Sequence, residues 1–386
     1  MNITADFIDE RFKAYILETY CENRDWIEKR DVERIVSLSL ATHSYSSLRG
    51  IEHFTSLEEL DCSYNELTSL DIRHNLQLRR LNCNQNEIHS LDLTSNVKLE
   101  TLDCGFNRIR HLDVSQNIML TKLVCDWNIL SELQLAQNTN LKELNCSYNS
   151  LFELNLDQNT QLTNLDCGNN YLISLNTQNG INLVEIRCNH NHLTNLDVTV
   201  NTALQSLRCF NNHITHLDLS QNARLEELFC SENKISKLDT SRNPQLTKLN
   251  YTNNLIVEPD YMVNGISTFR YDVSISTYSS TLLYKGKEVH VTTDASTKAD
   301  MERLSPIIQK AWEQFDELSD QALDLIANMH PDEDVNELVM SELSFEKDST
   351  FQLGFDAGDT PAGQLIIYVV FSQNLEINRE LVYETY

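Results

Sequence analysis

The sequence predicts an α/β solenoid, a coil of short repeated units, followed by a smaller α+β domain. Nine cysteines stand 21 residues apart from Cys62 to Cys230, and one further step of 21 reaches Tyr251. They lie in a recurring frame, LxxLxCxxNxLxxLxLxxN, first seen from Leu57 to Asn75. Repeats of about 20 to 50 residues form solenoids, because one unit cannot bury its apolar face alone. The period ends after Asn254, where VEPDYMVNG marks a boundary.

Residues 1–56 are expected to form a helical cap and an entry half-repeat. Ile8, Phe12, Ile16 and Tyr20 recur at helical spacing, which predicts a helix over residues 7–22. A charged second helix is expected over residues 25–35. Together the two helices would cover the apolar end of the first coil.

The solenoid is expected over residues 57–258, with a short strand before each cysteine. The asparagine three residues after each cysteine can turn the chain and hydrogen-bond the backbone of the neighbouring coil. A column of aspartates is also interpreted as structural, with carboxylates that accept backbone hydrogen bonds. This column contains Asp71, Asp92, Asp113, Asp197, Asp218 and Asp239. The ten frames, the last incomplete, begin at Leu57, Leu78, Leu99, Leu120, Leu141, Leu162, Leu183, Leu204, Leu225 and Leu246.

The frame resembles that of the leucine-rich repeat family, and within it the bacterial 21-residue class of the cysteine-ladder internalins. The resemblance covers roughly residues 36 to 256. It implies a solenoid in which cysteine replaces a core leucine. In relatives the cap often carries an acidic loop that resembles a calcium-binding hand. Here Arg24 and Trp26 stand where oxygen ligands and a glycine would be needed, so we expect no calcium.

The nine ladder cysteines are expected to be reduced and buried. Neighbouring coils are about 4.8 Å apart, so the thiols point the same way in parallel instead of meeting head on. Zinc binding by stacked thiols is the alternative, but the spacing lacks CxxC pairs and tetrahedral convergence.

Residues 259–386 are expected to form an acidic α+β domain. A β-meander is predicted over residues 266–293, and helices from Ser305-Pro306 and from Ser319 to Met329. Strands should resume near 338–346, 350–356, 364–371 and 376–383, which gives helices packed on an antiparallel sheet. The final stretch, with FDAGDTPAG and VYETY, resembles a small bacterial domain of unknown function found among toxin-neutralising accessory proteins.

Charge and composition limit the partners. The net charge is −27, and residues 260–386 hold 23 acidic and 8 basic side chains, a balance of −15. Such a surface repels nucleic acid and anionic membranes and attracts basic proteins. There is no run of 18 apolar residues and no apolar leader at the start. We therefore expect a cytoplasmic protein with a basic protein partner and no cofactor.

A protein-binding face is expected where exposed side chains flank the inward leucines and cysteines of the concave sheet. Phe106, Trp127 and Tyr148 occupy the same position in three consecutive coils, and clustered aromatics are typical of binding hot spots. The alternative is that these rings cover the sheet edge. The candidate residues are Tyr64, Phe106, Val124, Trp127, Tyr148, Arg187, Arg208, Phe210 and Phe229.

Other polar groups carry weaker signals. His190, His192 and His213 could approach one another, but no third ligand is evident, so no metal site is expected. Asp356 and Asp359 are flanked by glycine and proline and should shape a turn. No nucleophile elbow, P-loop, HExxH or dinucleotide fingerprint is present.

The expected function is therefore non-enzymatic protein binding. The specific hypothesis is an immunity-type protein that neutralises a basic bacterial toxin by occlusion. Three alternatives stay open: a general scaffold or regulator, an adhesin-like protein, and an enzyme within residues 260–386. The last would rely on Asp356, Asp359 and Glu384.

Overall fold

The computed structural model describes residues 1–22, 24–256, 259–272, 275, 277–331, 334–360 and 363–385. The chain divides into two compact units, Met1–Asn254 and Leu255–Tyr386. The domain boundary expected after residue 258 falls on a residue outside this description.

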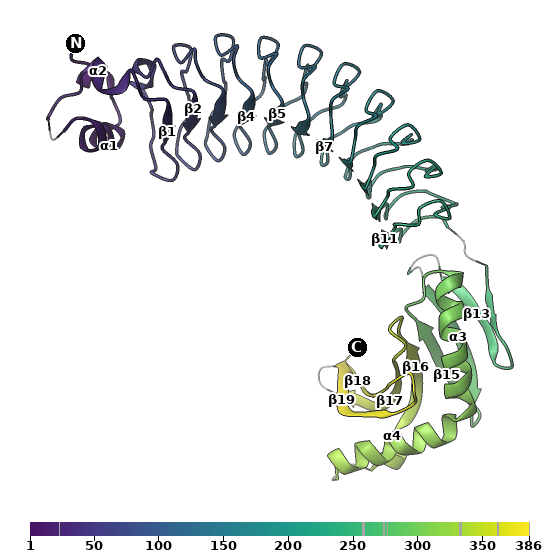
Figure 1. The fold of residues 1–386 in the computed structure, drawn as a ribbon. Coiled ribbons are helices and arrows are strands. Elements are labelled where there is room, and N and C mark those ends of the chain that lie inside the picture. The colour runs from purple at the N-terminus through teal and green to yellow at the C-terminus, as the bar shows by residue number, and fades with distance from the viewer. Residues whose placement is uncertain are drawn as a thin grey trace. The chain divides into compact units, whose positions relative to one another are not determined.

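The first unit is a solenoid whose parallel strands line the inner side of its curve (Figure 1). Each strand has three residues, and neighbours pair in register at 21-residue spacing, as Leu60 with Leu81. In β1 to β10 the middle residue is buried and the flanking residues are more exposed, because side chains alternate along a strand, whereas Leu249 in the last strand is exposed. The eleven strands, in spatial order, are β1 Ser37–Ser39, β2 Glu59–Asp61, β3 Arg80–Asn82, β4 Thr101–Asp103, β5 Lys122–Val124, β6 Glu143–Asn145, β7 Asn164–Asp166, β8 Glu185–Arg187, β9 Ser206–Arg208, β10 Glu227–Phe229 and β11 Lys248–Asn250.

Asparagine side chains tie each coil to the one before it. Asn86 donates through Nδ2 to the carbonyl oxygens of Cys62 (3.0 Å) and Cys83 (3.1 Å). Its Oδ1 accepts from the backbone N–H of Leu67 (3.0 Å). The same pattern recurs along the column, which confirms the predicted structural role. The aspartate column behaves as expected too: Asp92 accepts from the backbone N–H of Thr94, two residues on (3.1 Å).

All ten cysteines are free and buried, which confirms the predicted column. Burial raises the pKa of Cys188 and Cys230 to about 12, because the low-polarity interior disfavours a thiolate. The column is therefore a set of small apolar core residues.

The N-terminal cap is smaller than predicted. It contains α1 Glu10–Tyr20, α2 Lys29–Val32 and the 3₁₀ turns Thr4–Asp6 and Ile51–His53. The helix expected over residues 25–35 is reduced to four residues because the preceding backbone pairs with the N-terminus: Ile3 donates its N–H to the Ile27 carbonyl (2.9 Å). Asn23, in the loop considered for calcium, lies outside the described residues.

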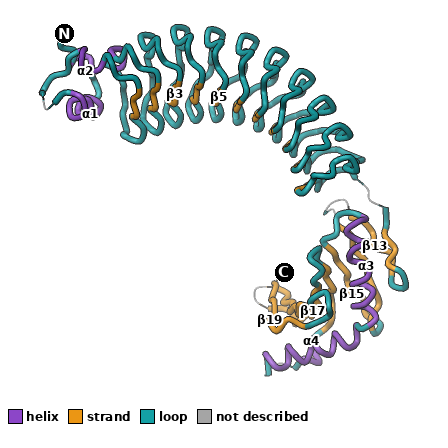
Figure 2. Tube along the Cα trace, viewed as in Figure 1, coloured by secondary structure: helices purple, strands orange, loops and turns teal. Residues whose placement is uncertain are grey.

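The second unit is an eight-stranded sheet with two helices inserted between its fourth and fifth strands (Figure 2). The strands follow chain order, and both helices bury one face against the sheet. The elements are β12 Tyr261–Val263, β13 Ser267–Asp272, β14 Thr277–Tyr284, β15 Lys287–Thr293, α3 Lys298–Glu313, α4 Phe315–Met329, the 3₁₀ turn Val335–Glu337, β16 Val339–Phe345, β17 Phe351–Thr360, β18 Gly363–Phe371 and β19 Ile377–Thr385.

Two expectations for this unit are wrong. The sheet is mixed, because β15 and β16 pair in parallel through the helical crossover. The first helix begins at Lys298 and not at Ser305, since Thr297 and Asp300 form a reciprocal capping box. Pro306 consequently lies inside α3. Part of the FDAGDTPAG stretch, residues 361 and 362, lies outside the described residues.

Candidate functional site

The chain leaves each strand of the solenoid through a turn with one left-handed residue. Two residues after each ladder cysteine and after Tyr251, φ lies between 48° and 56°, from Tyr64 to Asn253. Asparagine and glycine adopt this conformation most readily, and Asn169, Asn211 and Asn253 occupy it here. We call this turn and the extended residues just after it the carboxyl edge, and number the coils from Leu57.

Three aromatic rings stack along the carboxyl edge of coils 3 to 5. The Phe106 and Trp127 ring centroids are 5.4 Å apart, with 15° between the planes. Trp127 and Tyr148 are 4.0 Å apart and 11° from parallel. Each side chain keeps 40–46% of its surface exposed. The spacing follows from the coil height, because side chains in one column stand about 4.8 Å apart.

The stack does not lie where the sequence placed it. Phe106, Trp127 and Tyr148 were expected on the concave sheet, but they lie in the turns after β4, β5 and β6. The left-handed turn ends the strand before these positions are reached. Tyr64 lies in the same column and is exposed, but Gln85 separates it from the stack.

The remaining candidate residues lie on or beside the sheet. Val124 ends β5, Arg187 ends β8, Arg208 ends β9 and Phe229 ends β10. Phe210 follows two residues after Arg208, with its ring 5.0 Å from that of His190. Apart from Tyr64 in coil 1 and Val124 in coil 4, the candidates therefore form two groups, an edge stack in coils 3 to 5 and a sheet group in coils 7 to 9.

Both arginines of the sheet group are already paired. Arg187 contacts Glu185 (2.7 Å) and Asp166 (3.8 Å). Arg208 contacts Glu227 (3.4 Å) and places its guanidinium 4.9 Å from the centre of the Phe229 ring. Such a cation–π contact orders the arginine and offers a flat surface to a partner.

Three partly buried carboxylates lie at or just after the strand ends of coils 3, 4 and 6. Burial raises the pKa of Asp126 to about 6, and the charge of Asp103 adds to that rise. Burial also raises the pKa of Asp103 and Asp166. A cation brought by a partner would stabilise these carboxylates.

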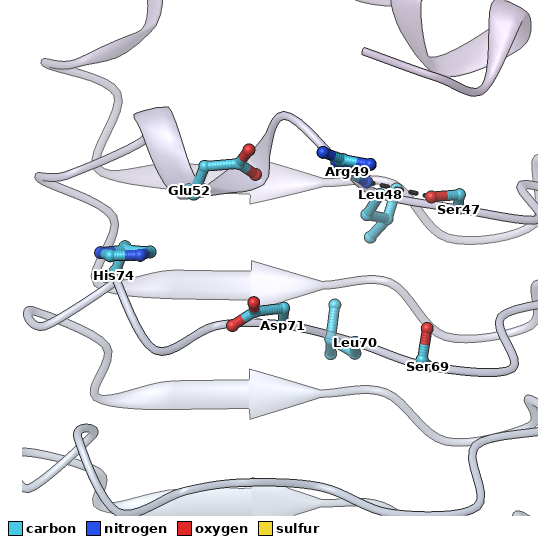
Figure 3. A pocket seen from close by; sticks show the side chains of 8 residues that line it. All are labelled: Ser47, Leu48, Arg49, Glu52, Ser69, Leu70, Asp71 and His74. Carbon is cyan, nitrogen blue, oxygen red and sulfur yellow. Dashed lines mark hydrogen bonds between the residues drawn. The ribbon is translucent and has the colours of Figure 1, made fainter. Parts of the chain in front are cut away.

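A pocket of about 370 Å³ lies between the cap and coil 1 (Figure 3). It is lined mostly by polar and charged side chains, including Arg49, Glu52 and His74. Asp71 in its wall is held by Arg73 (2.7 Å), which lowers the pKa of Asp71 to about 2. The pocket gathers no nucleophile and base pair and gives no reason to assign chemistry.

Within the described residues, no group of three or more His, Cys, Asp or Glu side chains is arranged to hold a metal ion. His192 and His213 stack with centroids 5.8 Å apart, while His190 bonds Asn211 through Nδ1 (2.8 Å). No helix in the described part of the chain is long and apolar enough to cross a membrane.

Sequence reading missed other exposed residues of the carboxyl edge. Ile129, Phe152, Tyr171 and Ile173 lie in the two outward columns that follow the stack column, and each is 42–66% exposed. The signal was available: the columns two and four residues after Phe106 hold apolar side chains in coils 4 to 6. Reading a single column concealed it.

The regular 21-residue coil, the inward leucines and the buried cysteine column define a leucine-rich-repeat solenoid with a cysteine ladder. The internalin InlF of Listeria monocytogenes has the same fold, with a TM-score of 0.54 and 21% identity over 65% of this chain and 84% of that chain. A leucine-rich-repeat protein of Leptospira interrogans gives a TM-score of 0.50 and 24% identity, over 60% and 69% of the two chains.

The functional domain of InlJ from Listeria monocytogenes, which includes a cysteine ladder, is 29% identical over 67% of this chain and 72% of that chain, with a TM-score of 0.42. No protein-family model and no curated protein matches this chain. The first unit is thus a bacterial-type leucine-rich-repeat solenoid, followed by a separate mixed-sheet unit.

Proposed function

We propose that this chain is a protein-binding protein that holds its partner against the carboxyl edge of the solenoid. The observation that carries the proposal is the exposed stack of Phe106, Trp127 and Tyr148 at a left-handed backbone position. Such a position costs a bulky residue about 1 kcal/mol or more. Asparagine occupies it without that cost in other coils of the same chain.

The left-handed backbone conformation therefore does not explain why aromatic residues occupy these positions. Mutual stacking stabilises them in part, since an aromatic pair contributes about 0.5 to 1.5 kcal/mol. Yet 46% of Trp127 stays exposed, so the stack leaves much apolar area for a partner to bury. Tryptophan and tyrosine dominate hot spots because they bury large areas at small conformational cost.

The finer part of the proposal is that the partner is basic and is neutralised by occlusion, as an immunity-type protein neutralises a toxin. The net charge of −27 supports this by steering cations inward, as do the carboxylates of Asp103 and Asp126. The reduced cysteine column favours a cytoplasmic location. A general scaffold with another protein partner is the rival reading.

Trp127→Asn tests the binding role. Asparagine suits the left-handed turn, so the melting temperature should change by no more than about 2 °C while recovery of the cross-linked native partner falls at least about tenfold. Gln85→Asn is the matched control, because it makes the same kind of change in the same column outside the stack. Undiminished recovery by Trp127→Asn would refute the proposal.

The charge of the partner is tested by measuring the rate at which the recovered native partner associates with this chain. The association rate should fall steeply between 0.01 M and 0.15 M salt, as the Debye length shortens from about 30 Å to about 8 Å. A flat rate, or an acidic partner, would remove the electrostatic basis of neutralisation and leave the scaffold reading.

A further inference from the structure

A second row of stacked rings continues the carboxyl edge beyond the first. Phe152 and Tyr171 have centroids 5.4 Å apart and planes 22° from parallel. Tyr171 stacks on His192 (6.0 Å, 28°), and His192 on His213 (5.8 Å, 17°). The row therefore runs from coil 5 to coil 8.

The two rows overlap in coil 5, which carries both Tyr148 and Phe152. Exposed and buried residues alternate after each turn, so Tyr148, Ser150 and Phe152 face the same side. Ile129 and Ile173 add exposed apolar area in the neighbouring coils. The result is a strip three columns wide over coils 3 to 8, which we call the apolar strip. Its apolar residues lie in coils 3 to 6, and coils 7 and 8 extend it with histidine, threonine and asparagine. Six coils at the strand spacing give it a length of about 24 Å.

The apolar strip carries no acidic residue. It comprises positions 106, 108 and 110 and their equivalents every 21 residues through coil 8, three positions in six coils, and none of these 18 is Asp or Glu. The chain as a whole has 57 acidic against 30 basic residues, so this is a local reversal. Arg108 and Arg110 lie at the coil 3 end, while just beyond the other end, in coil 9, Glu232 and Lys234 stand in the same columns and balance each other.

These charges are partly engaged within the chain. Arg108 contacts Glu87 in the preceding coil (3.2 Å) but stays 55% exposed. The strip is therefore basic at its coil 3 end, apolar in coils 4 to 6 and polar in coils 7 and 8. A partner segment that fits it would bring acidic residues to coil 3 and apolar residues to coils 4 to 6.

We infer that the apolar strip docks a protein segment with an apolar centre and an acidic end that lies against Arg108 and Arg110. The inference rests on the proposed function and specifies the chemistry of the contact. An extended segment of about seven residues spans the strip at about 3.3 Å per residue. A partner that is basic overall can still carry a local acidic segment. Its long-range attraction to this chain depends on its whole charge distribution, whereas the fit to the apolar strip depends only on the residues in contact.

The test is selection of random 12-residue peptides displayed on phage against the immobilised full chain. The selected peptides should carry an apolar centre with Asp or Glu toward one end. A synthetic copy of the best peptide should bind Ile173→Ser at least about fivefold more weakly, and Tyr171→Ser with Ile173→Ser at least about tenfold more weakly.

Ile181→Ser is the matched control. Ile181 lies in the same coil as Ile173 and is 60% exposed against 66%, but it stands in the turn that precedes β8. The control should bind the peptide like the unchanged chain. An equal loss in Ile181→Ser, or peptides flanked by Lys and Arg, would overturn the inference.

Two further outcomes separate this inference from the proposed function. In the first, Trp127→Asn no longer binds the native partner, while the double variant Tyr171→Ser with Ile173→Ser binds both the native partner and the peptide as the unchanged chain does. The proposed binding function would then stand, and the inference about the apolar strip would fail. If instead the chain self-associates and Ile173→Ser abolishes that association without any peptide selection, a second copy covers the strip and the inference also fails.

Discussion

The asparagine after each turn donates hydrogen bonds through Nδ2 and accepts them through Oδ1. Asn128 donates to the carbonyl oxygens of Cys104 (3.0 Å), Cys125 (3.2 Å) and Asp126 (3.2 Å), and accepts from the N–H of Ile109 (2.9 Å). No other side chain of that size supplies both donors and an acceptor in this geometry. The residue is therefore specified by the backbone groups around it and not by packing.

Asn128→Ala should lower the free energy of unfolding by about 3 kcal/mol. The change leaves the buried N–H of Ile109 and the nearby carbonyl groups without their partner. Asn140→Ala, an exposed asparagine of the same coil with one bond to the Ile118 carbonyl, should cost less than about 1 kcal/mol. Urea unfolding followed by circular dichroism measures both values. Equal losses would show that the buried network contributes little.

Asp126 should make the protein less stable as pH rises from about 4 to about 6. Its pKa is raised from 3.8 to about 6, so the unfolded chain releases this proton at lower pH than the folded chain. The ionised form then costs about 1 to 2 kcal/mol above pH 6, after allowance for solvent screening.

Asp126→Asn should therefore raise the melting temperature at pH 7.5 and leave it almost unchanged at pH 4. Asp113→Asn should act in the opposite direction at pH 7.5, because hydrogen bonds from Ser115 lower the pKa of Asp113. Thermal unfolding at the two pH values decides this. A gain for Asp126→Asn that is the same at both values would point to a cause other than charge.

Each coil acts as one element, with a three-residue strand, a left-handed turn and an extended return. In coils 1 to 9 the central leucine or isoleucine and the cysteine are buried, and neighbouring strands pair in register, so the core is continuous. A cysteine in this column meets no partner thiol and no solvent. The low reactivity expected of these thiols therefore follows from their buried position in the coil and not from the residue type alone.

Alkylation under native conditions should therefore label no more than one or two cysteines, and all ten in denaturant. The thiols are buried, and burial holds the pKa of Cys188 and Cys230 at about 12, so little thiolate forms. Intact-mass analysis counts the labels. Mass deficits after non-reducing digestion would reveal disulfides and contradict a reduced column.

The whole chain combines two units with separate cores. Leu123 is fully buried among solenoid residues, and Phe345 among the strands and helices of the second unit. A repeat array and a mixed sheet are stabilised by different contacts, nearest-neighbour stacking in one and long-range pairing in the other.

Calorimetry should show two transitions that respond to separate substitutions. Leu123→Ala and Phe345→Ala each remove about 3 kcal/mol of core packing, so each should lower one transition and leave the other in place. If either change moved both transitions together, the two units would unfold as one.

The repeat made most of the solenoid predictable. Ten copies of one frame assign each position the same surroundings ten times, so the buried leucines, the cysteine column and both structural polar columns could be assigned from periodicity. The strands and the second helix of the second unit were placed approximately by alternation and helical spacing. The parallel pairing of β15 with β16 was not predictable, because it depends on where the crossover returns the chain.

The surface was decided by tertiary structure. Phe106, Trp127 and Tyr148 could be seen as one column in the sequence, but only the left-handed turn moved them from the sheet to the edge. Tyr148 and Tyr171 belong to different columns, and residues 21 apart come side by side only when the coils stack about 4.8 Å apart. The repeat in the sequence determines which residues each coil buries, because the same positions are buried in successive coils. Which exposed residues lie side by side depends on how the coils are stacked.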